Sequence, residues 1–203
     1  MSTRWAVNAI SWLRELIATA WFTRLAYIRL AFHGARIGSH LSVRGPLNLH
    51  IHHSGRIELG DYCRLNSGFN SNPVGASTRM TVWVGPQGRL KIGDRVGLSN
   101  STIVCMNSVS IADDVFIGGD CKIYDTDFHP IPMADRIHNL TAPSVAPIAI
   151  GRGSFIGGHS ILLKGTIIGE GAVIGSGSVV AGSIPAFEIW AGNPARFIKK
   201  IEP

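Results

Sequence analysis

The residues best suited to chemistry are a histidine that follows two carboxylates and precedes a proline. They form the segment DTDFHP, residues 125–130. Imidazole titrates near neutral pH, and a neighbouring carboxylate, Asp125 or Asp127, can fix its tautomer and raise its basicity. The segment makes His129 a candidate general base. The alternatives are that His129 is a structural or merely exposed loop residue, and that one aspartate caps the loop through backbone hydrogen bonds.

Other histidines and the cysteines give weaker signals. In an extended segment His50 and His52 share one face while His53 points away, which favours a solvated face over a metal site. The three cysteines contain no CxxC pair, so neither a disulfide framework nor a cysteine zinc site is indicated; they are Cys63, Cys105 and Cys121. We therefore expect no metal, and a reducing cytoplasm fits best.

A six-residue period of aliphatic side chains indicates the elements that must position His129. Large aliphatic residues recur at Ile150, Ile156, Leu162, Ile168, Ile174 and Val180. Two places before all but the first of them stand small residues, namely Ser154, Ser160, Thr166, Ala172 and Ser178. One aliphatic position, one small position and a turn-permitting glycine describe a short strand and a corner. Because one such unit cannot bury its aliphatic side chain alone, the units must stack into a mainly β solenoid, a parallel β-helix.

The same register continues upstream and sets the organisation of the chain. It appears at Ile111, Ile117 and Ile123, with Cys121 in a small-residue position, and more loosely at Ile92, Leu98 and Val104 and at Ile37, Val43 and Leu49. We expect a helical segment over 1–33, the β-helix over 34–185 and a closing segment over 186–203. Two stretches break the register, 66–89 and 124–147, and are expected to be external loops that carry function.

The N-terminal segment is basic and apolar. Seven arginines and one glutamate occupy residues 1–56, whereas the rest of the chain is balanced, so the net charge of +6 lies at the front. Polar positions recur at three- and four-residue steps from Arg4 to Thr23 and leave an apolar face, formed by Trp5, Trp12, Leu13, Leu16, Ile17 and Phe22. The longest uncharged run is far short of the ~20 residues that a membrane span requires. The pattern predicts amphipathic helix that lies on an anionic membrane, or that packs on its own domain or a neighbouring subunit.

Composition excludes several classes of protein. With 203 residues, 45% of them hydrophobic and 16% charged, the chain is suited to one domain with a substantial core, and 24 glycines argue against a long helical bundle. A nucleic-acid-binding role is not indicated, because the basic excess lies on an apolar segment and no binding module appears.

The hexads, together with the His-Pro pair in the second loop, resemble the hexapeptide-repeat acyltransferases, in particular the sugar O-acetyltransferases that modify galactosides, maltose and polysaccharides. The likeness covers about the last half of the chain. It implies a left-handed β-helix, a homotrimer with acetyl-CoA between adjacent prisms, and direct transfer in which His129 removes a proton from the acceptor. The same fold hosts zinc enzymes of the gamma carbonic anhydrase type, but the short-spaced histidine pair of that class is missing among His129, His138 and His159.

The resemblance also implies roles on the donor side. The backbone amide of Gly158 would stabilise the developing oxyanion, and that of Ser176 would face the cofactor. Phe155 stands where relatives often have a tryptophan beside the pantetheine arm. Relatives commonly have a lysine where this chain has Gly182, so the contacts to the CoA phosphates are expected from Arg196 and Lys199.

On the acceptor side, Asn100 matches an asparagine that binds the sugar in the galactoside and maltose enzymes, with the alternative that it is a corner residue tolerant of positive φ. The resemblance thus implies an acetyl-CoA-dependent sugar O-acetyltransferase in cell-surface polysaccharide or glycolipid biosynthesis, cytoplasmic or peripheral on the inner face of the membrane. Two alternatives are N-acetylation of an amino-sugar nucleotide and a non-catalytic, membrane-attached β-helix scaffold.

Overall fold

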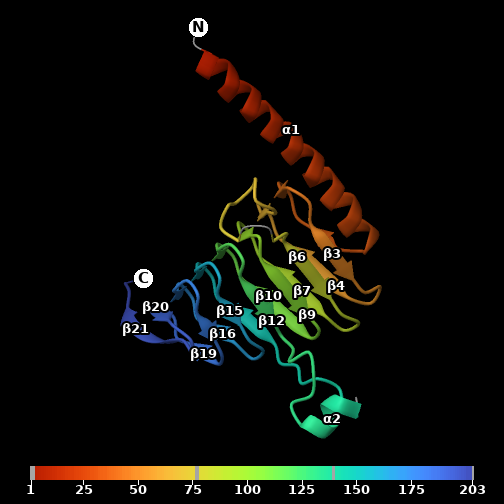
Figure 1. Cartoon of the computed structure of the whole chain (residues 1–203), viewed down its shortest axis with the longest axis vertical. Coiled ribbons are helices and arrows are strands. Elements are labelled where there is room, and N and C mark those ends of the chain that lie inside the picture. The colour runs from red at the N-terminus through yellow and green to blue at the C-terminus, as the bar shows by residue number, and fades with distance from the viewer. Residues whose placement is uncertain (1–2, 76–77, 139, 203) are drawn as a thin grey trace.

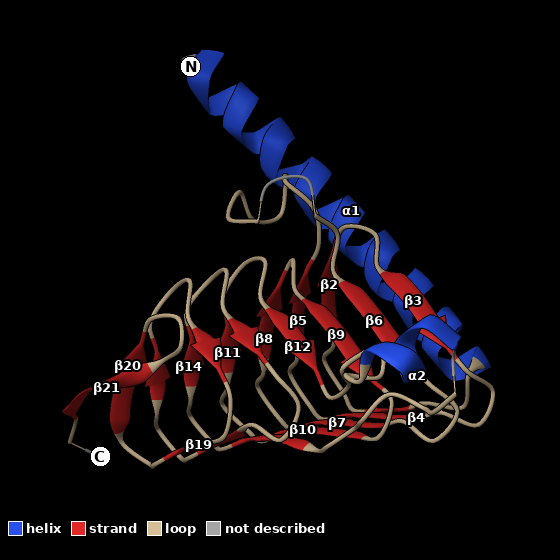
Figure 2. Cartoon of the chain, turned by 60° about the horizontal axis from the view of Figure 1, so that its bottom comes forward, coloured by secondary structure: helices blue, strands red, loops and turns tan. Residues whose placement is uncertain are grey.

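The computed structural model describes residues 3–75, 78–138 and 140–202, and the side chains of the first helix from Asn8 onward. After the helix α1 (Thr3–Phe32), the chain coils through three parallel sheets, each of which takes every third strand (Figures 1 and 2). The expected fold, a left-handed parallel β-helix of triangular section, is confirmed.

The strands fall into sheets A, B and C. Sheet A consists of β1 (Arg36–Ile37), β4 (Arg56–Leu59), β7 (Arg89–Ile92), β10 (Ser108–Ile111), β13 (Ile148–Ile150), β16 (Ile167–Ile168) and β19 (Ser183–Ile184). Sheet B consists of β2 (Ser42–Arg44), β5 (Arg64–Asn66), β8 (Gly97–Ser99), β11 (Phe116–Ile117), β14 (Phe155–Ile156), β17 (Val173–Ile174), β20 (Glu188–Ala191) and the antiparallel β21 (Arg196–Lys200). Sheet C consists of β3 (Asn48–Ile51), β6 (Thr81–Val84), β9 (Thr102–Cys105), β12 (Lys122–Tyr124), β15 (Ile161–Leu162) and β18 (Val179–Val180).

The predicted aliphatic ladder fills the interior of the prism. Ile150 pairs in register with Ile168, Ile156 with Ile174, and Leu162 with Val180, one coil apart. All six side chains are buried, and burying each contributes about 1.5–3 kcal/mol. The period of six therefore predicted the core correctly.

The small positions are buried as well, and all but Ala172 carry a hydroxyl group. Ser154 and Ser160 link successive coils. Ser154 Oγ donates to the carbonyls of Gly151 (2.7 Å) and Gly169 (2.9 Å). Ser160 Oγ does the same with Gly157, at 2.7 Å, and Gly175, at 3.2 Å. Because a buried hydroxyl is costly without a partner, a small residue that bonds the corner carbonyls fits this position.

The upstream register needs two corrections. The inward residue of β9 is Ile103, which pairs with Ile123, whereas Val104 pairs with Tyr124 on the outer side. The corner before β9 has fewer residues than the corner before β12, so the hexad loses a position there. The first register break is also shorter than 66–89, because the alternating segment Thr81–Val84 forms β6. We call the remainder the excursion 67–80, of which the structure describes 67–75 and 78–80.

The C-terminal half of α1 packs on the first coil, mainly against β2 and also against β1, while its N-terminal half projects from the prism (Figure 1). Ala26 and Leu30 are buried in the core. Thr23 Oγ1 accepts a hydrogen bond from the backbone nitrogen of Val43 at 2.9 Å, and Arg29 donates to the carbonyl of Leu47 at 2.8 Å. Polar as well as apolar side chains therefore attach the helix to the prism.

The apolar face of α1 is turned outward. Exposed side chains recur at helical spacing at Ile10, Leu13, Ile17, Trp21 and Ile28, and Trp12 and Leu16 are exposed too. The interpretation that this face packs on its own domain is wrong for them, and of the expected apolar face Phe22 alone packs against the core among the side chains described. The side chains of Arg4 and Trp5 lie outside the described residues. Within the described chain, no helix is long and apolar enough to cross a membrane.

The second register break forms an outgrowth, which we define as residues 125–147 without 139. It leaves sheet C after β12, carries the short helix α2 (Met133–His138) and returns to sheet A at β13 (Figures 1 and 2). The outgrowth stands away from the prism at the edge between sheets C and A, which we call the CA edge. It carries His129.

Candidate functional site

Asp125 anchors the first turn of the outgrowth. Its side chain is completely buried, and its two oxygens accept hydrogen bonds from the backbone nitrogens of Met106 and Asn107, both at 2.7 Å. Both oxygens therefore bind the coil below. The expectation that Asp125 orients the His129 ring is wrong for this chain, and the alternative of a loop-capping aspartate describes it.

Asp127 also has another partner. Its Oδ2 lies 3.4 Å from Lys164 Nζ, on a later coil, and its carbonyl accepts a hydrogen bond from the backbone nitrogen of His129 at 2.7 Å. The expected contact between its carboxylate and the imidazole is not formed. Thr126 pairs with Val145 in an antiparallel bridge that closes the base of the outgrowth. The Asp125 carboxylate thus holds the backbone of the coil below, and the Asp127 carboxylate ties the turn to Lys164.

His129 itself is exposed. Its neighbour Phe128 has a φ of 64° and packs edge-on against Tyr124, with ring centroids 5.0 Å apart. Among the described residues, none forms a hydrogen bond or ion pair with the His129 ring. An exposed imidazole on an anchored turn can accept a proton from a molecule that approaches from outside.

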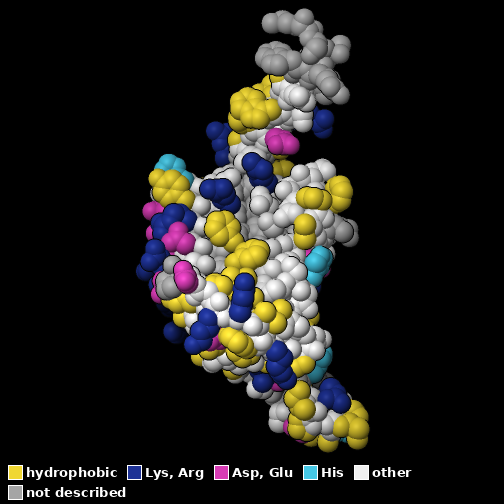
Figure 3. All heavy atoms as spheres, turned by 90° about the vertical axis from the view of Figure 1, so that its left-hand side faces the viewer, with side chains coloured by type: hydrophobic (Ala, Val, Ile, Leu, Met, Phe, Trp, Pro, Cys, Tyr) yellow, Lys and Arg dark blue, Asp and Glu magenta, His cyan; other side chains and the backbone are white. Residues whose placement is uncertain are grey.

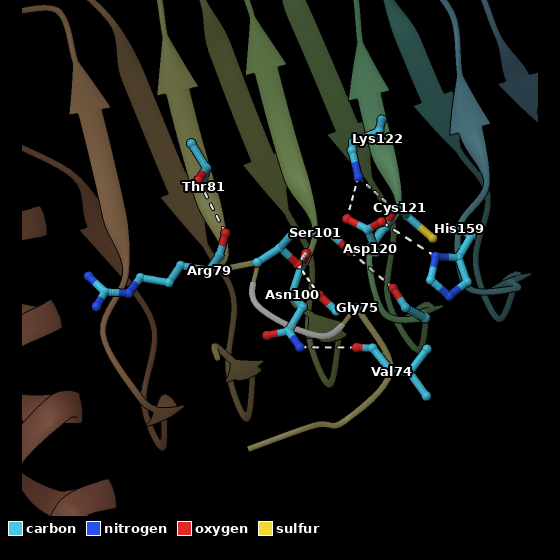
Figure 4. Close-up of polar contacts among 12 residues, drawn as sticks. Val74, Gly75, Arg79, Thr81, Asn100, Ser101, Asp120, Cys121, Lys122 and His159 are labelled. Carbon is cyan, nitrogen blue, oxygen red and sulfur yellow. Dashed lines mark hydrogen bonds and ion pairs between the residues drawn. The ribbon is translucent and has the colours of Figure 1, made fainter. Parts of the chain in front are cut away.

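Asn100 lies on a different edge, between sheets B and C, which we call the BC edge (Figure 4). Its side chain is completely buried, and its backbone adopts a φ of 44°. Oδ1 accepts from the nitrogen of Gly68 at 2.6 Å, and Nδ2 donates to the carbonyls of Asn72 (2.8 Å) and Val74 (3.0 Å). The geometry therefore gives Asn100 the role of a corner residue that holds the excursion 67–80, which was the alternative to sugar binding.

Gly158 and Ser176 lie on the same BC edge, one coil apart. Neither backbone amide donates a hydrogen bond to another residue of the described chain. The corner is tightly packed, because a Cβ on Gly118 would lie 2.5 Å from the nitrogen of Gly158, and a Cβ on Gly157 would lie 2.5 Å from that of Ser176. Glycine at these corners lets the coils approach closely.

The remaining predicted donor-side residues lie on the outer face of sheet B. Phe155 is 47% exposed and pairs in register with the exposed Phe116 on the preceding coil. Arg196 and Lys199 are exposed on β21, the last strand of that sheet. Every residue expected to contact the cofactor therefore lies on sheet B or on the BC edge.

The predicted site residues thus form two groups within one chain. Gly158 and the other donor-side residues lie on sheet B and the BC edge, whereas His129 lies on the CA edge, and the width of sheet C separates the two edges. The structure does not bring His129 into contact with the donor-side group.

One polar cluster on the BC edge was not singled out from the sequence (Figure 4). Asp120 pairs with Lys122 and lies 3.4 Å from His159 Nδ1. Burial by itself raises the pKa of the Asp120 carboxyl, but the hydrogen bonds and charges of Lys122 and His159 outweigh it, so the pKa is lowered. The signal was present, because Asp120 and His159 each follow an Ile-Gly-Gly unit in successive coils.

The histidines near the start of the chain pair with each other and with neighbours. His50 packs against Trp83, His52 against His53, and His52 Nδ1 lies 2.8 Å from Ser54 Oγ. Within 3–75, 78–138 and 140–202, no three His, Cys, Asp or Glu side chains are grouped so as to hold a metal ion.

The cysteines are buried in the prism. Burial raises the pKa of the Cys105 thiol to about 12 and that of Cys121 to about 11. Both thiols are protonated at neutral pH and unsuited to nucleophilic attack.

Comparisons with known proteins agree with this architecture. Residues 147–182 match the family model for the bacterial transferase hexapeptide, six repeats. A candidate acetyltransferase of Mycobacterium tuberculosis is 30% identical over 120 residues, and a candidate acetyltransferase of Saccharomyces cerevisiae is 37% identical over 111. A candidate O-acetyl transferase of lipopolysaccharide biosynthesis from Escherichia coli is 30% identical over 107. The matches cover 56%, 54% and 48% of this chain but 38%, 55% and 53% of those relatives, so the chain spans about half of their length or less.

Two solved structures share the fold. AntD, an N-acyltransferase from Bacillus cereus in complex with dTDP and 3-hydroxybutyryl-CoA, has a TM-score of 0.66 at 19% identity, covering 86% of this chain and 87% of its own. A galactoside acetyltransferase in complex with coenzyme A has a TM-score of 0.54 at 22% identity, covering 94% and 80%. The chain thus carries hexapeptide repeats of the bacterial transferase type over residues 147–182, and it shares its fold with these two acyltransferase structures.

Proposed function

We propose that the chain transfers the acetyl group of acetyl-CoA to a sugar hydroxyl, in the assembly of a cell-surface polysaccharide or glycolipid. The acceptor oxygen forms a bond to the acetyl carbonyl carbon while the bond from that carbon to sulfur breaks. His129 accepts the proton of the hydroxyl, and the proton then passes to the departing thiolate of CoA. No nucleophile of the protein is needed, and the chemistry consists of positioning plus general base catalysis.

The observation that carries the proposal is the exposed imidazole of His129 on a turn fixed by Asp125 and Asp127. The two carboxylates bind the backbone and Lys164, so the turn is held without consuming the ring nitrogens. An ordered support of this kind limits the motion that would misplace a catalytic base. In this proposal the acceptor and a second copy of the chain supply the remaining contacts to the ring.

The donor side is supported by three features of sheet B and the BC edge. The amide of Gly158 has no partner among the described residues and can donate to the oxyanion that develops on the thioester. The exposed ring of Phe155 offers an aromatic wall for the pantetheine arm, and Arg196 and Lys199 offer charge for the CoA phosphates. The amide of Ser176 is a further donor toward the cofactor.

The two separated edges favour an assembly. If the CA edge of one copy lies against the BC edge of the next, His129 and Gly158 meet across the interface, and a cyclic arrangement of three-sided prisms closes as a homotrimer. Light scattering on the purified protein tests this: an active trimer is expected, and an active monomer would contradict it.

For Asn100 we propose a positioning role at the acceptor. Its three hydrogen bonds shape the excursion 67–80, which borders the BC edge where the acceptor would lie. Asn100→Ala should then raise KM for the acceptor more than KM for acetyl-CoA.

The activity is tested by thiol release from acetyl-CoA with a panel of sugars, and by mass spectrometry of the product. The wild-type chain should release CoA with at least one hydroxyl acceptor, and His129→Ala should lower kcat by about 10²–10⁴-fold. His138→Ala, on the exposed helix α2 of the same outgrowth, is the matched control and should retain activity. Retained activity in His129→Ala would contradict the proposed role.

A second candidate is N-acetylation of an amino-sugar nucleotide, favoured by the fold likeness to the N-acyltransferase AntD. The same panel separates the two, because an amino-sugar nucleotide would be consumed in preference to hydroxyl acceptors. The scaffold alternative predicts no thiol release with any acceptor.

We also propose that α1 lies on the inner face of a membrane. The projecting helix presents hydrophobic side chains beside basic ones (Figure 3). Arg14 and Arg24 belong to this helix, and none of the described carboxylates pairs with either arginine. An amphipathic helix of this kind binds anionic lipid by apolar burial and charge. The double variant Ile17→Glu/Trp21→Glu should lose binding to anionic vesicles, whereas Ile131→Glu, on the outgrowth, should not.

A further inference from the structure

A cleft of about 420 Å³ separates α1 from the start of the β-helix. One wall is the helix face that carries Glu15, Ala18, Thr19 and Phe22. The other wall is formed by Arg44 with the turn that follows β2, and by residues of the excursion 67–80. The cleft lies on the side of the helix opposite the exposed apolar stripe, since residues 15, 18, 19 and 22 share one helical face.

Two arginines give the cleft its charge. Arg44 and Arg79 both line it and are exposed, and neither forms an ion pair with a carboxylate of the described chain. Glu15 lines the same cleft and forms no ion pair with a basic side chain of the described chain. The two arginines and this one carboxylate give the lining a formal charge of +1. Guanidinium groups present planar, paired donors that suit phosphate oxygens.

The backbone around these arginines is firmly held. Gly45 has a φ of 82°, and a Cβ there would lie 1.9 Å from the carbonyl oxygen of Ser67, so the turn after Arg44 approaches the excursion in a way that requires glycine. Ser71 Oγ donates to the carbonyl of Arg44 at 3.0 Å, and the nitrogen of Met80 donates to Ser67 Oγ at 3.0 Å. Both arginines therefore extend from an ordered base.

Part of the cleft is apolar. Phe22 packs partly against the core on the helix side, and Phe69, which is 64% exposed, faces solvent from the excursion. A ligand that carries both an anionic group and an apolar segment fits such a lining better than an inorganic ion does.

The cleft also connects two parts of the proposed site. Arg79 belongs to the excursion that Asn100 holds, and its side chain points away from the Asn100 corner, on the side where α1 lies (Figure 4). Lys and Arg side chains gather around the base of the projecting helix in Figure 3. A group bound at Arg44 and Arg79 would lie between the BC edge and the helix.

We infer that this cleft is a phosphate-ester subsite, in which Arg44 and Arg79 bind a phosphate attached to the acceptor sugar. The inference rests on the proposed function, since it assigns the acceptor to the class of sugars that carry a phosphate ester. The ester belongs either to a lipid carrier that reaches around α1 from the membrane or to a soluble nucleotide sugar. The shared chemistry is the phosphate.

Calorimetry with the full chain tests the subsite, with dodecyl phosphate below its critical micelle concentration, UDP, inorganic phosphate and dodecanol as probes. Arg44→Gln/Arg79→Gln should weaken binding of a phosphate ester at least tenfold. Arg64→Gln/Arg89→Gln is the matched control: it removes two exposed strand arginines outside this cleft and should change binding less than twofold. Tighter binding of dodecyl phosphate than of UDP assigns a lipid source, and the reverse assigns a soluble one.

A substitution of Glu15 should change ligand affinity in the direction opposite to that of the arginine variants. Because its carboxylate opposes an anion in the cleft, Glu15→Gln should tighten binding several-fold, which no loss of folding could mimic. Equal weakening in the two arginine pairs, or binding of inorganic phosphate as tight as that of both esters, would overturn the inference.

Failure of the subsite and failure of the proposed function give different results. Arginine-dependent binding of an ester without thiol release from acetyl-CoA would refute the transferase and leave the subsite intact. Thiol release with a sugar acceptor, together with ester binding that ignores Arg44 and Arg79, would refute the subsite and leave the transferase intact.

Discussion

The coils of residues 148–184 and the outgrowth 125–147 use buried polar groups in opposite ways. In the coils each hexad stacks an inward aliphatic residue on the next, and at Ser154 and Ser160 a small hydroxyl residue bonds the corner glycines. In the outgrowth Asp125 and Asp127 each serve once, on unrelated partners. Repetition stabilises the coils and makes them predictable from the sequence, whereas the carboxylates of the outgrowth position a single exposed side chain, that of His129.

The largest expected difference between the regions is in stability. Ile156→Ala removes a completely buried rung and should lower the free energy of unfolding by about 2–5 kcal/mol. Ile131→Ala, on the outgrowth at 70% exposure, should change it by less than about 0.5 kcal/mol. Denaturant unfolding of the two variants measures this, and similar losses at both positions would erase the distinction.

Within the outgrowth, substitution of the two aspartates should lower the free energy of unfolding by different amounts. Asp125→Asn places an amide where a buried carboxylate accepted two backbone hydrogen bonds, and should cost about 1–3 kcal/mol. Asp127→Asn removes a partly exposed ion pair with Lys164 and should cost less than about 1 kcal/mol. Thermal unfolding at pH 7 ranks them, and a larger loss for Asp127→Asn would show that the outgrowth is anchored differently.

The smallest effect concerns an ion pair that crosses coils at the edge between sheets A and B. The hydrogen bond from Arg95, aided by Arg152, lowers the pKa of Asp114 to about 2 against its ordinary 3.8, although some burial acts in the other direction. Since the folded-state pKa is depressed, the stabilisation is present above pH 3.8 and is lost as the pH falls through about 2.

Asp114→Asn should therefore be less stable than the wild type above about pH 4, and the gap should close near pH 2. Unfolding curves across this range, at low and high salt, provide the measurement. A gap that persists at pH 2 would assign the effect to packing instead of charge.

The sequence was sufficient for the core because each hexad is locally determined. Ile156 and Ser160 follow from the period alone, and the register failed only where a corner changed length, at Ile103, and where the alternating strand β6 was taken for loop. Contacts that a single residue makes only once produce no periodic pattern in the sequence. Nothing in DTDFHP distinguishes a carboxylate that orients a ring from one that caps the backbone 18 or 19 residues earlier, at Asn107 and Met106.

The same limit applies to the BC edge and to α1. Asn100 could be placed at a corner, but its three hydrogen bonds depend on the path of the excursion 67–80, which has no period. The amphipathic pattern of α1 was visible, yet which face meets the prism is decided by the complementarity of Thr23 and Ala26 with sheet B.

The proposed reaction requires a site shared by two copies, with His129 from one and the BC edge from the next. Its most direct test is co-expression of His129→Ala with Ser176→Trp, which fills an exposed corner on the proposed cofactor side, each with its own affinity tag. Each variant alone should be inactive. Mixed trimers purified through both tags should regain roughly a third of the wild-type activity, because every cyclic trimer that contains both variants has one intact interface out of three. Mixed assemblies as inactive as the separate variants would contradict the shared site.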